Sequence, residues 1–109
     1  MGAAQAAPDG NAAVATSGSD GARRPHGTIR YWAAAKAAAG TGAESYGAAT
    51  LAEALEAARQ RHAGNPEFAR VLLRCSFLVD GDPVGTRGHE TVTLTEGGTV
   101  EVLPPFAGG

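Results

Sequence analysis

The sequence predicts an α+β fold in which a mixed sheet is covered by one main amphipathic helix. Segments that alternate apolar and polar residues, the pattern of strands, stand on both sides of a strongly helical segment that begins at Thr50. The composition also changes at Thr28, because alanine, glycine and small polar residues dominate the chain before it. We therefore expect one small domain over residues 28–109.

Residues 1–27 are predicted to form a disordered tail. They include no Leu, Ile, Phe, Tyr or Trp, so they bury too little apolar surface to offset the entropy of ordering them. The tail is also a poor signal peptide, because Pro8-Asp9-Gly10-Asn11 interrupts the alanines and Arg23-Arg24 runs into Pro25. No stretch is long enough to cross a membrane. We expect a cytoplasmic protein that does not associate with membranes.

The first elements of the domain form a hairpin. Residues 28–32 alternate and are rich in strand formers, so they predict the first strand. The alanines of residues 33–39 predict a short helical turn that Gly40 ends. Residues 44–46 are predicted to be a second strand, paired with the first.

The main helix is predicted from Thr50, where Thr50 and Glu53 have the spacing of a capping box. It extends for about 14 residues, until Gly64 and Asn65-Pro66 break it. Acidic and basic residues fall largely on its other side. The residues predicted on its apolar face are Leu51, Ala54, Leu55, Ala58 and His62.

Further strands follow the helix. After a short turn within residues 66–74, strands are predicted at 76–79, 91–94 and 99–103, with a hairpin at Asp80-Gly81. The order of hairpin, helix and further strands is typical of a β-grasp fold. Spacing alone leaves other α+β arrangements open.

Charge and side-chain chemistry exclude several functions. The formal net charge is −2 and no basic stretch is interleaved with aromatic residues, so we expect no nucleic-acid binding. Cys75 is the single cysteine and is interpreted as an ordinary small buried residue, because the sequence identifies no base that would activate it. His89-Glu90 lacks the second histidine of a zinc-protease motif, and His62 is interpreted as a helix-end residue. We expect no metal site and no catalysis by the chain alone.

The most informative segment lies beyond the last predicted strand. It reads Pro104-Pro105-Phe106-Ala107-Gly108-Gly109. A diglycine alone is weak evidence, because 16 of 109 residues are glycine and Gly97-Gly98 is another pair. Its setting is stronger evidence: two prolines stiffen the exit from the strand, and the last three residues are small enough to enter a narrow channel in another protein.

The group that this segment is expected to present is the α-carboxylate of Gly109. It is ionised at neutral pH and can attack the α-phosphate of ATP to form an acyl-adenylate, which a sulfur nucleophile can displace. Every polar catalytic group in this scheme can belong to a partner. The alternative is a frayed terminus, which does not explain the prolines and the aromatic residue before the glycines.

These features resemble the MoaD/ThiS family of ubiquitin-like sulfur carriers, and most of all the small subunits of molybdopterin synthase. The resemblance implies a β-grasp fold. Two features depart from the family pattern. The tail of residues 1–27 is longer than a minimal carrier needs, and Gly98 stands where family members often place an acidic residue. The segments that carry the resemblance are Ile29-Arg30-Tyr31-Trp32-Ala33, the helix from Thr50, Phe77-Leu78-Val79-Asp80-Gly81 and residues 102–109.

The resemblance implies a reaction cycle. An E1-like enzyme would adenylate Gly109, and a sulfur donor system, a sulfurtransferase or cysteine desulfurase, would convert it to a thiocarboxylate. The tail would then insert into the large subunit of molybdopterin synthase and donate sulfur to the pterin precursor, with Leu103 docking on the partner. The chain would bind no cofactor, since ATP-Mg belongs to the activating enzyme. The residues expected in the partner's channel are Pro104, Pro105, Phe106, Ala107 and Gly108.

Three alternatives remain open. The same chemistry serves a carrier for another pathway, such as cysteine, thiamine or another sulfur-containing metabolite, because the partner recognises the sulfur acceptor. A ubiquitin-like modifier conjugated to lysines uses the same diglycine. A β-grasp interaction module with an inert terminus uses neither. The double proline mildly favours the molybdopterin pathway.

Overall fold

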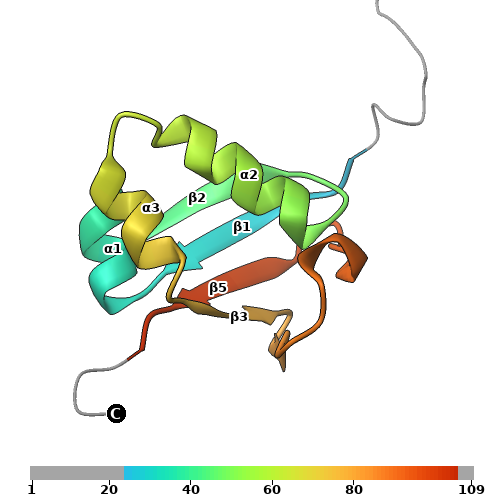
Figure 1. Ribbon diagram of the computed structural model, residues 1–109. Helices are drawn as coiled ribbons and strands as arrows, with labels where there is room; N and C mark the ends of the chain where they lie inside the picture. Colours follow the sequence, from blue (N-terminus) through green and yellow to red (C-terminus); the bar gives the residue numbers. More distant parts are fainter. Residues whose placement is uncertain (1–23, 106–109) are drawn as a thin grey trace, which may run out of the picture.

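The computed structural model describes residues 24–105, in which a five-stranded mixed sheet carries α2 across one face, with α1 and α3 gathered at one end (Figure 1). Most of the predicted tail lies outside the described residues. The elements in chain order are β1 (His26–Tyr31), α1 (Ala33–Ala39), β2 (Ala43–Gly47), α2 (Leu51–Arg61), α3 (Pro66–Leu72), β3 (Ser76–Val79), β4 (Asp82–Pro83), a short 3-10 helix (His89–Thr91) and β5 (Thr99–Leu103).

The strand order is β2-β1-β5-β3-β4, so the strand that comes last in the sequence occupies the centre. β1 lies antiparallel to β2 and parallel to β5, with Ile29 beside Val100. β3 lies antiparallel to β5, with Phe77 opposite Val102. The predicted Asp80-Gly81 turn joins β3 to β4, and its residues have φ of 51° and 87°. The arrangement is a β-grasp fold, as predicted.

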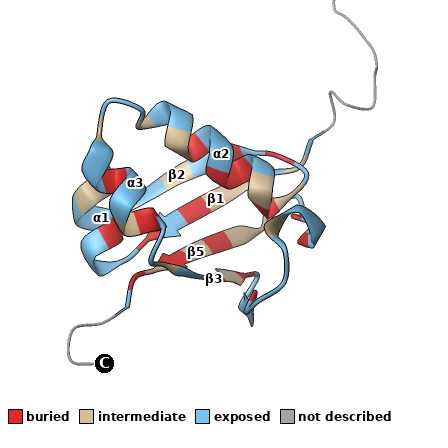
Figure 2. Cartoon of the chain, viewed as in Figure 1, coloured by how far each residue is buried: buried red, intermediate tan, exposed pale blue. Residues whose placement is uncertain are grey.

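The core lies between the sheet and α2. Val100 and Val102 of β5 and Leu51 of α2 are fully buried, and Figure 2 shows buried positions along β1, β5 and the side of α2 that faces them. The predicted apolar face of α2 is confirmed, because Leu51, Ala54, Leu55 and Ala58 are all buried. Burial of each large aliphatic side chain stabilises the fold by about 1.5–3 kcal/mol.

The first strand begins at His26, two residues before the predicted start at Thr28. Gly27, predicted to belong to the tail, lies opposite Tyr46 in the sheet. A Cβ at this position would lie 2.4 Å from the carbonyl oxygen of Gly98 and 2.5 Å from the Tyr46 ring. Glycine is therefore required here by close packing, whereas the sequence suggested only flexibility.

The predicted strand at residues 91–94 is wrong. Its start belongs to the 3-10 helix, and Thr93 forms an isolated bridge to Thr50. Val92 and Leu94 are buried as the alternation predicts, but they pair with the segment that leads into α2: the Leu51 N–H donates to the Val92 carbonyl and the Leu94 N–H to the Ala49 carbonyl, both over 2.9 Å. An alternating pattern predicts which side chains are buried and does not identify the segment that accepts the backbone hydrogen bonds.

The two short helices support each other. α1 ends at Gly40, whose φ is 77°, as predicted. α3 is a full helix where the sequence predicted only a short turn, and it begins at Asn65, whose side-chain oxygen accepts from the Phe68 N–H over 3.3 Å. The Asn65 side-chain amide also donates to the Ala38 carbonyl of α1 over 2.7 Å. Asn65 therefore starts one helix and holds the other.

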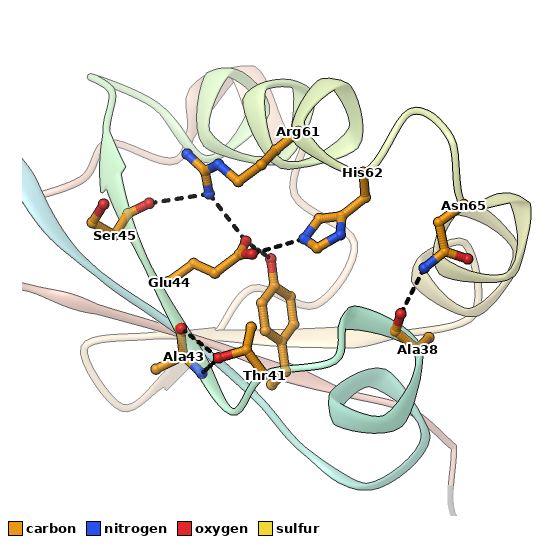
Figure 3. A network of polar contacts seen from close by, with 9 residues as sticks. Ala38, Thr41, Ala43, Glu44, Ser45, Arg61, His62 and Asn65 are labelled. Carbon is orange, nitrogen blue, oxygen red and sulfur yellow. Dashed lines mark hydrogen bonds and ion pairs between the residues drawn. The ribbon is translucent and has the colours of Figure 1, made fainter.

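A polar network lies at the end of α2, which stops at Arg61 and is therefore 11 residues long and shorter than predicted (Figure 3). The carboxylate of Glu44 on β2 accepts hydrogen bonds from the Tyr31 hydroxyl (2.9 Å) and Arg61 (3.0 Å), and lies 2.8 Å from Nε2 of His62. The His62 ring also stacks on Phe68 of α3, with centroids 4.2 Å apart. The side chain of His62, which was predicted to lie on the apolar face of the helix, thus connects the end of α2 to β2 and α3.

The Glu44 side chain is only 14% exposed. Its desolvation pushes the pKa of the carboxyl upward, but hydrogen bonds from Tyr31, Arg61 and His62 outweigh it and hold the pKa of Glu44 below its ordinary value. Because the folded state binds this proton more weakly than the unfolded state, ionised Glu44 stabilises the fold above its unfolded pKa. That contribution is lost as the pH falls through the folded value.

We expect Thr50→Ala to lower the free energy of unfolding by about 1 kcal/mol. The Thr50 hydroxyl accepts from the Glu53 N–H over 3.2 Å, and the Glu53 carboxylate accepts from the Ala49 N–H over 3.1 Å. Urea denaturation at neutral pH measures the change, with Thr86→Ala, at an exposed loop position, as the matched control. Equal losses in the two variants would show that the cap contributes nothing specific.

We expect Glu44→Gln to lower the free energy of unfolding at neutral pH by about 1–3 kcal/mol, because partly buried hydrogen bonds to a charged acceptor are lost. Its stability should also decline less steeply than the wild type's as the pH falls below the ordinary glutamate pKa of 4.5, since the carboxyl that takes up a proton there is gone. Urea denaturation from neutral pH downward tests both effects, with Glu56→Gln, whose side chain is 60% exposed, as the control. Parallel pH profiles for wild type and Glu44→Gln would contradict the role of the network.

Candidate functional site

The end of β5 forms the described part of the candidate site. Leu103 pairs with Ser76 of β3, and the Trp32 N–H donates to the Val102 carbonyl over 3.2 Å on the β1 side. Pro104 and Pro105 follow; neither can donate a backbone hydrogen bond, so the ladder stops there as predicted. Pro104 is buried and Pro105 is exposed. The path out of the sheet therefore starts from a fixed point on the central strand.

The other predicted tail residues, Phe106, Ala107, Gly108 and Gly109, lie outside the described residues. The structure shows the residues to which they are attached, at the end of β5. Strand β5 is held by β1 on one side and by β3 on the other. A segment attached to a doubly paired central strand starts from a defined position and direction.

Leu103 lies on the sheet face opposite α2. Residues alternate along a strand, so Val100 and Val102 point into the core while Glu101 and Leu103 point to the outer face. Arg30 of β1 and Leu78 of β3 are the register partners of Glu101 and share this face. In the described part of the chain no helix covers it (Figure 1).

Trp32 is held in place at the exit end of this outer face. Its indole N–H donates to the Glu101 carboxylate over 3.1 Å, and the Arg30 guanidinium carbon lies 5.6 Å from its ring centroid. Trp32 is nevertheless 41% exposed. An aromatic ring that is fixed and partly exposed is typical of protein contact surfaces, because little conformational entropy remains to be lost on binding.

The alternative reactive groups do not form a site. Burial raises the pKa of the Cys75 thiol to about 11, so it is protonated at neutral pH and a poor nucleophile; its Sγ donates to the Val71 carbonyl over 3.3 Å. His89 packs edge-on against Phe77, with centroids 5.2 Å apart. Over residues 24–105 no three His, Cys, Asp or Glu side chains gather as metal ligands would.

A family model described as the ThiS family matches residues 29–109. The chain belongs to the ThiS family. This is the family of ubiquitin-like sulfur carriers that the sequence resembles, and the match includes the diglycine as well as the sheet. No curated protein matches the chain.

Solved structures of similar fold extend the comparison of this ThiS-family chain. Small archaeal modifier protein 1 from Methanosarcina acetivorans has 16% identity and a TM-score of 0.66, over 79% of this chain and 98% of that one. A putative molybdopterin converting factor subunit 1 from Pyrococcus furiosus has 18% identity and a TM-score of 0.60, over 75% and 99%. A complex of subunits 1 and 2 of molybdopterin-converting factor from Helicobacter pylori has 19% identity and a TM-score of 0.55, over 77% and 99%. At these identities the likeness establishes the fold.

The outer face was only partly predictable. The sequence singled out Leu103 but assigned Trp32 simply to a strand and gave Arg30, Leu78 and Glu101 no role. Alternation could have placed each of them on one face of its own strand. That these side chains lie together depends on the register between β1 and β5. The paired residues of these strands are about 70 positions apart in the chain, and the hydrogen bond between Trp32 and Glu101 likewise joins residues 69 positions apart.

None of the helices within residues 24–105 is long and apolar enough to span a membrane.

Proposed function

We propose that this ThiS-family chain is a sulfur carrier that is activated at its C-terminal glycine and serves molybdopterin biosynthesis. The observation that carries the proposal is that Pro104-Pro105-Phe106-Ala107-Gly108-Gly109 directly continues the central strand of a β-grasp domain. A carboxylate on such a tail can enter another protein while the domain stays outside. The chain then needs no catalytic groups of its own.

The proposed chemistry takes place at Gly109. A carboxylate oxygen attacks the α-phosphate of ATP, pyrophosphate leaves, and a glycyl-adenylate forms. The persulfide of a donor protein then attacks the carbonyl carbon, and AMP leaves to give an acyl disulfide. A second thiol attacks the donor's sulfur, forms a disulfide with the donor and releases the thiocarboxylate. An E1-like enzyme supplies ATP-Mg and the catalytic groups. Glycine suits the first two attacks, because it has no Cβ to block the approach to the carbonyl.

Geometry supports a tail that reaches into a partner. The four residues beyond Pro105 span at most about 14 Å when extended, so the partner has to approach the end of β5 closely. Pro105 is exposed there, and Trp32 lies at the same end of the sheet. We infer that the outer face around Leu103 and Trp32 docks on the partner, which aligns the tail with the channel.

The pathway is proposed from two of the structural neighbours. One is named as a putative molybdopterin converting factor subunit, and the other is a complex of the two subunits of such a factor. They favour a large synthase subunit as the protein that accepts the sulfur. A carrier for cysteine, thiamine or another sulfur-containing metabolite would use the same tail, and the identity of the accepting enzyme separates these pathways.

A second candidate is a ubiquitin-like modifier, favoured by the neighbour named as a small archaeal modifier. The same adenylate would then be attacked by a lysine amine, with loss of AMP and formation of an isopeptide bond. Intact mass of the protein from its host separates the two functions: a thiocarboxylate replaces one oxygen by sulfur, whereas a modifier forms branched adducts. Lys36 is the single lysine and would be the sole side-chain amine for linkage between copies.

We expect one bulky residue added after Gly109 to abolish activation, because it removes the glycyl carboxylate and blocks a narrow channel. The measurement is ATP–pyrophosphate exchange with the E1-like enzyme of the same organism. The same residue added before Met1 is the control and should leave exchange unchanged. Continued exchange by the extended chain would disprove activation at the terminal carboxylate.

We expect Leu103→Asp to raise the KM for the carrier in this assay by roughly tenfold or more with little change in kcat, because it places a charge at the centre of an apolar contact. The fold should tolerate it, since Leu103 points away from the core. Thr28→Asp, at the other end of the same face, is the control. Equal KM values for the two variants would show that the partner does not dock at the exit end.

A further inference from the structure

A groove lies beside the exit of the tail, between α1, α3 and the end of β5. Its volume is about 380 Å³, and it is open to solvent. Apolar surface is supplied by Ala34 of α1, Val71 of α3, and Pro104 and Pro105. Figure 1 shows α1 and α3 at the end of the sheet where β5 leaves it. The volume is at the small end of the range for small-molecule sites, roughly 300–1,000 Å³, so the groove suits one or two side chains of another protein.

The rim of this exit groove carries a net positive charge. Arg70, Glu67 and Arg74 line it. Arg70 and Glu67 form an ion pair with each other, which cancels their charges, whereas Arg74 forms no ion pair with another described residue and is exposed. Ala34 and Pro105, which are both exposed, supply apolar surface in the same groove. An unpaired guanidinium beside exposed apolar surface is complementary to a carboxylate flanked by an apolar side chain.

Position limits the occupant to an enzyme that takes up the tail, and in the proposed cycle the activating enzyme is the first to do so. Pro105 belongs to the groove and immediately precedes the tail, so an enzyme that takes the tail into its active site must also cover Pro105. The same enzyme therefore lies within reach of Arg74. A nucleic acid does not fit, because the chain has a formal net charge of −2 and the groove offers one uncompensated cation.

We propose that the exit groove receives an acidic segment of the E1-like activating enzyme. A carboxylate of that segment binds Arg74, and a neighbouring apolar side chain covers Ala34, Val71 and Pro105. This contact lies beside the end of the sheet, on the α3 side, whereas the outer face around Leu103 and Trp32 lies on the side without helices. It rests on the proposed activation of Gly109 and specifies how the activating enzyme holds the root of the tail.

Charge reversal at Arg74 tests the proposal. With the E1-like enzyme of the same organism, Arg74→Glu should raise the KM for the carrier in ATP–pyrophosphate exchange by roughly fivefold or more, with kcat retained, and the effect should shrink as salt is added. Arg74→Lys keeps the charge and should stay close to wild type. Arg24→Glu is the matched control: its ion pair with Glu53 is solvent-exposed and worth little, and it precedes β1, at the opposite end of the sheet.

A photo-crosslinking residue in place of Ala34, an exposed residue of the groove, tests the chemistry of the occupant. Crosslinks to a segment of the enzyme that contains Asp or Glu within a few residues support the proposal. Crosslinks to a neutral or basic segment, or none, overturn it, and so does an unchanged KM for Arg74→Glu. These failures leave the proposed function intact if wild type is activated and the chain extended beyond Gly109 is not. Absence of exchange with the wild-type chain would overturn both proposals.

Discussion

The pairing of β5 with both β1 and β3 is the interaction on which the rest of the structure depends. In the described sheet, β1 and β3 each contact β5 and do not pair with each other. The two hairpins, β1–β2 and β3–β4, therefore become one sheet only when β5 lies between them. Val100 and Val102 are fully buried, so the same strand supplies backbone hydrogen bonds to both neighbours and the centre of the apolar core. The ladder stops where Pro104 and Pro105 begin.

Two surfaces near the exit of β5 follow from this arrangement. Alternation along β5 and its neighbours places Glu101 and Leu103 on the outer face, where Trp32 is held by Glu101 and Arg30. On the other side, α1 and α3 frame the exit groove with Arg74 at its rim. Asn65 and the Glu44 network fix α3 against α1 and α2. Polar contacts among α1, α2 and α3 thus determine which side chains lie beside Pro104 and Pro105.

The sequence was sufficient for features that local chemistry determines, such as the Thr50 cap, the Asp80-Gly81 turn and the buried positions of the strands. It misjudged features that depend on distant partners. Residues 91–94 alternate like a strand, but their hydrogen bonds go to the segment before α2. The composition around Gly27 predicted that it belongs to the tail, although Tyr46 and Gly98 leave no room for a Cβ. Of the candidate site, the tail was recognisable from its residue order, while Trp32–Glu101 and the groove required the tertiary arrangement.

The central place of β5 has a consequence for synthesis, because the chain emerges with its N-terminal side first. Both hairpins and all three helices are available before the strand that unites them, and the apolar faces around Ile29 and Phe77 stay uncovered until it arrives. Contacts between β1 and β5 join residues from the two ends of the domain sequence. Such long-range pairing favours a slow, late folding step. Completion of the sheet and anchoring of the tail are then one event. A partner that recognises the ordered residues before the tail then binds fully folded molecules and does not bind partly folded ones.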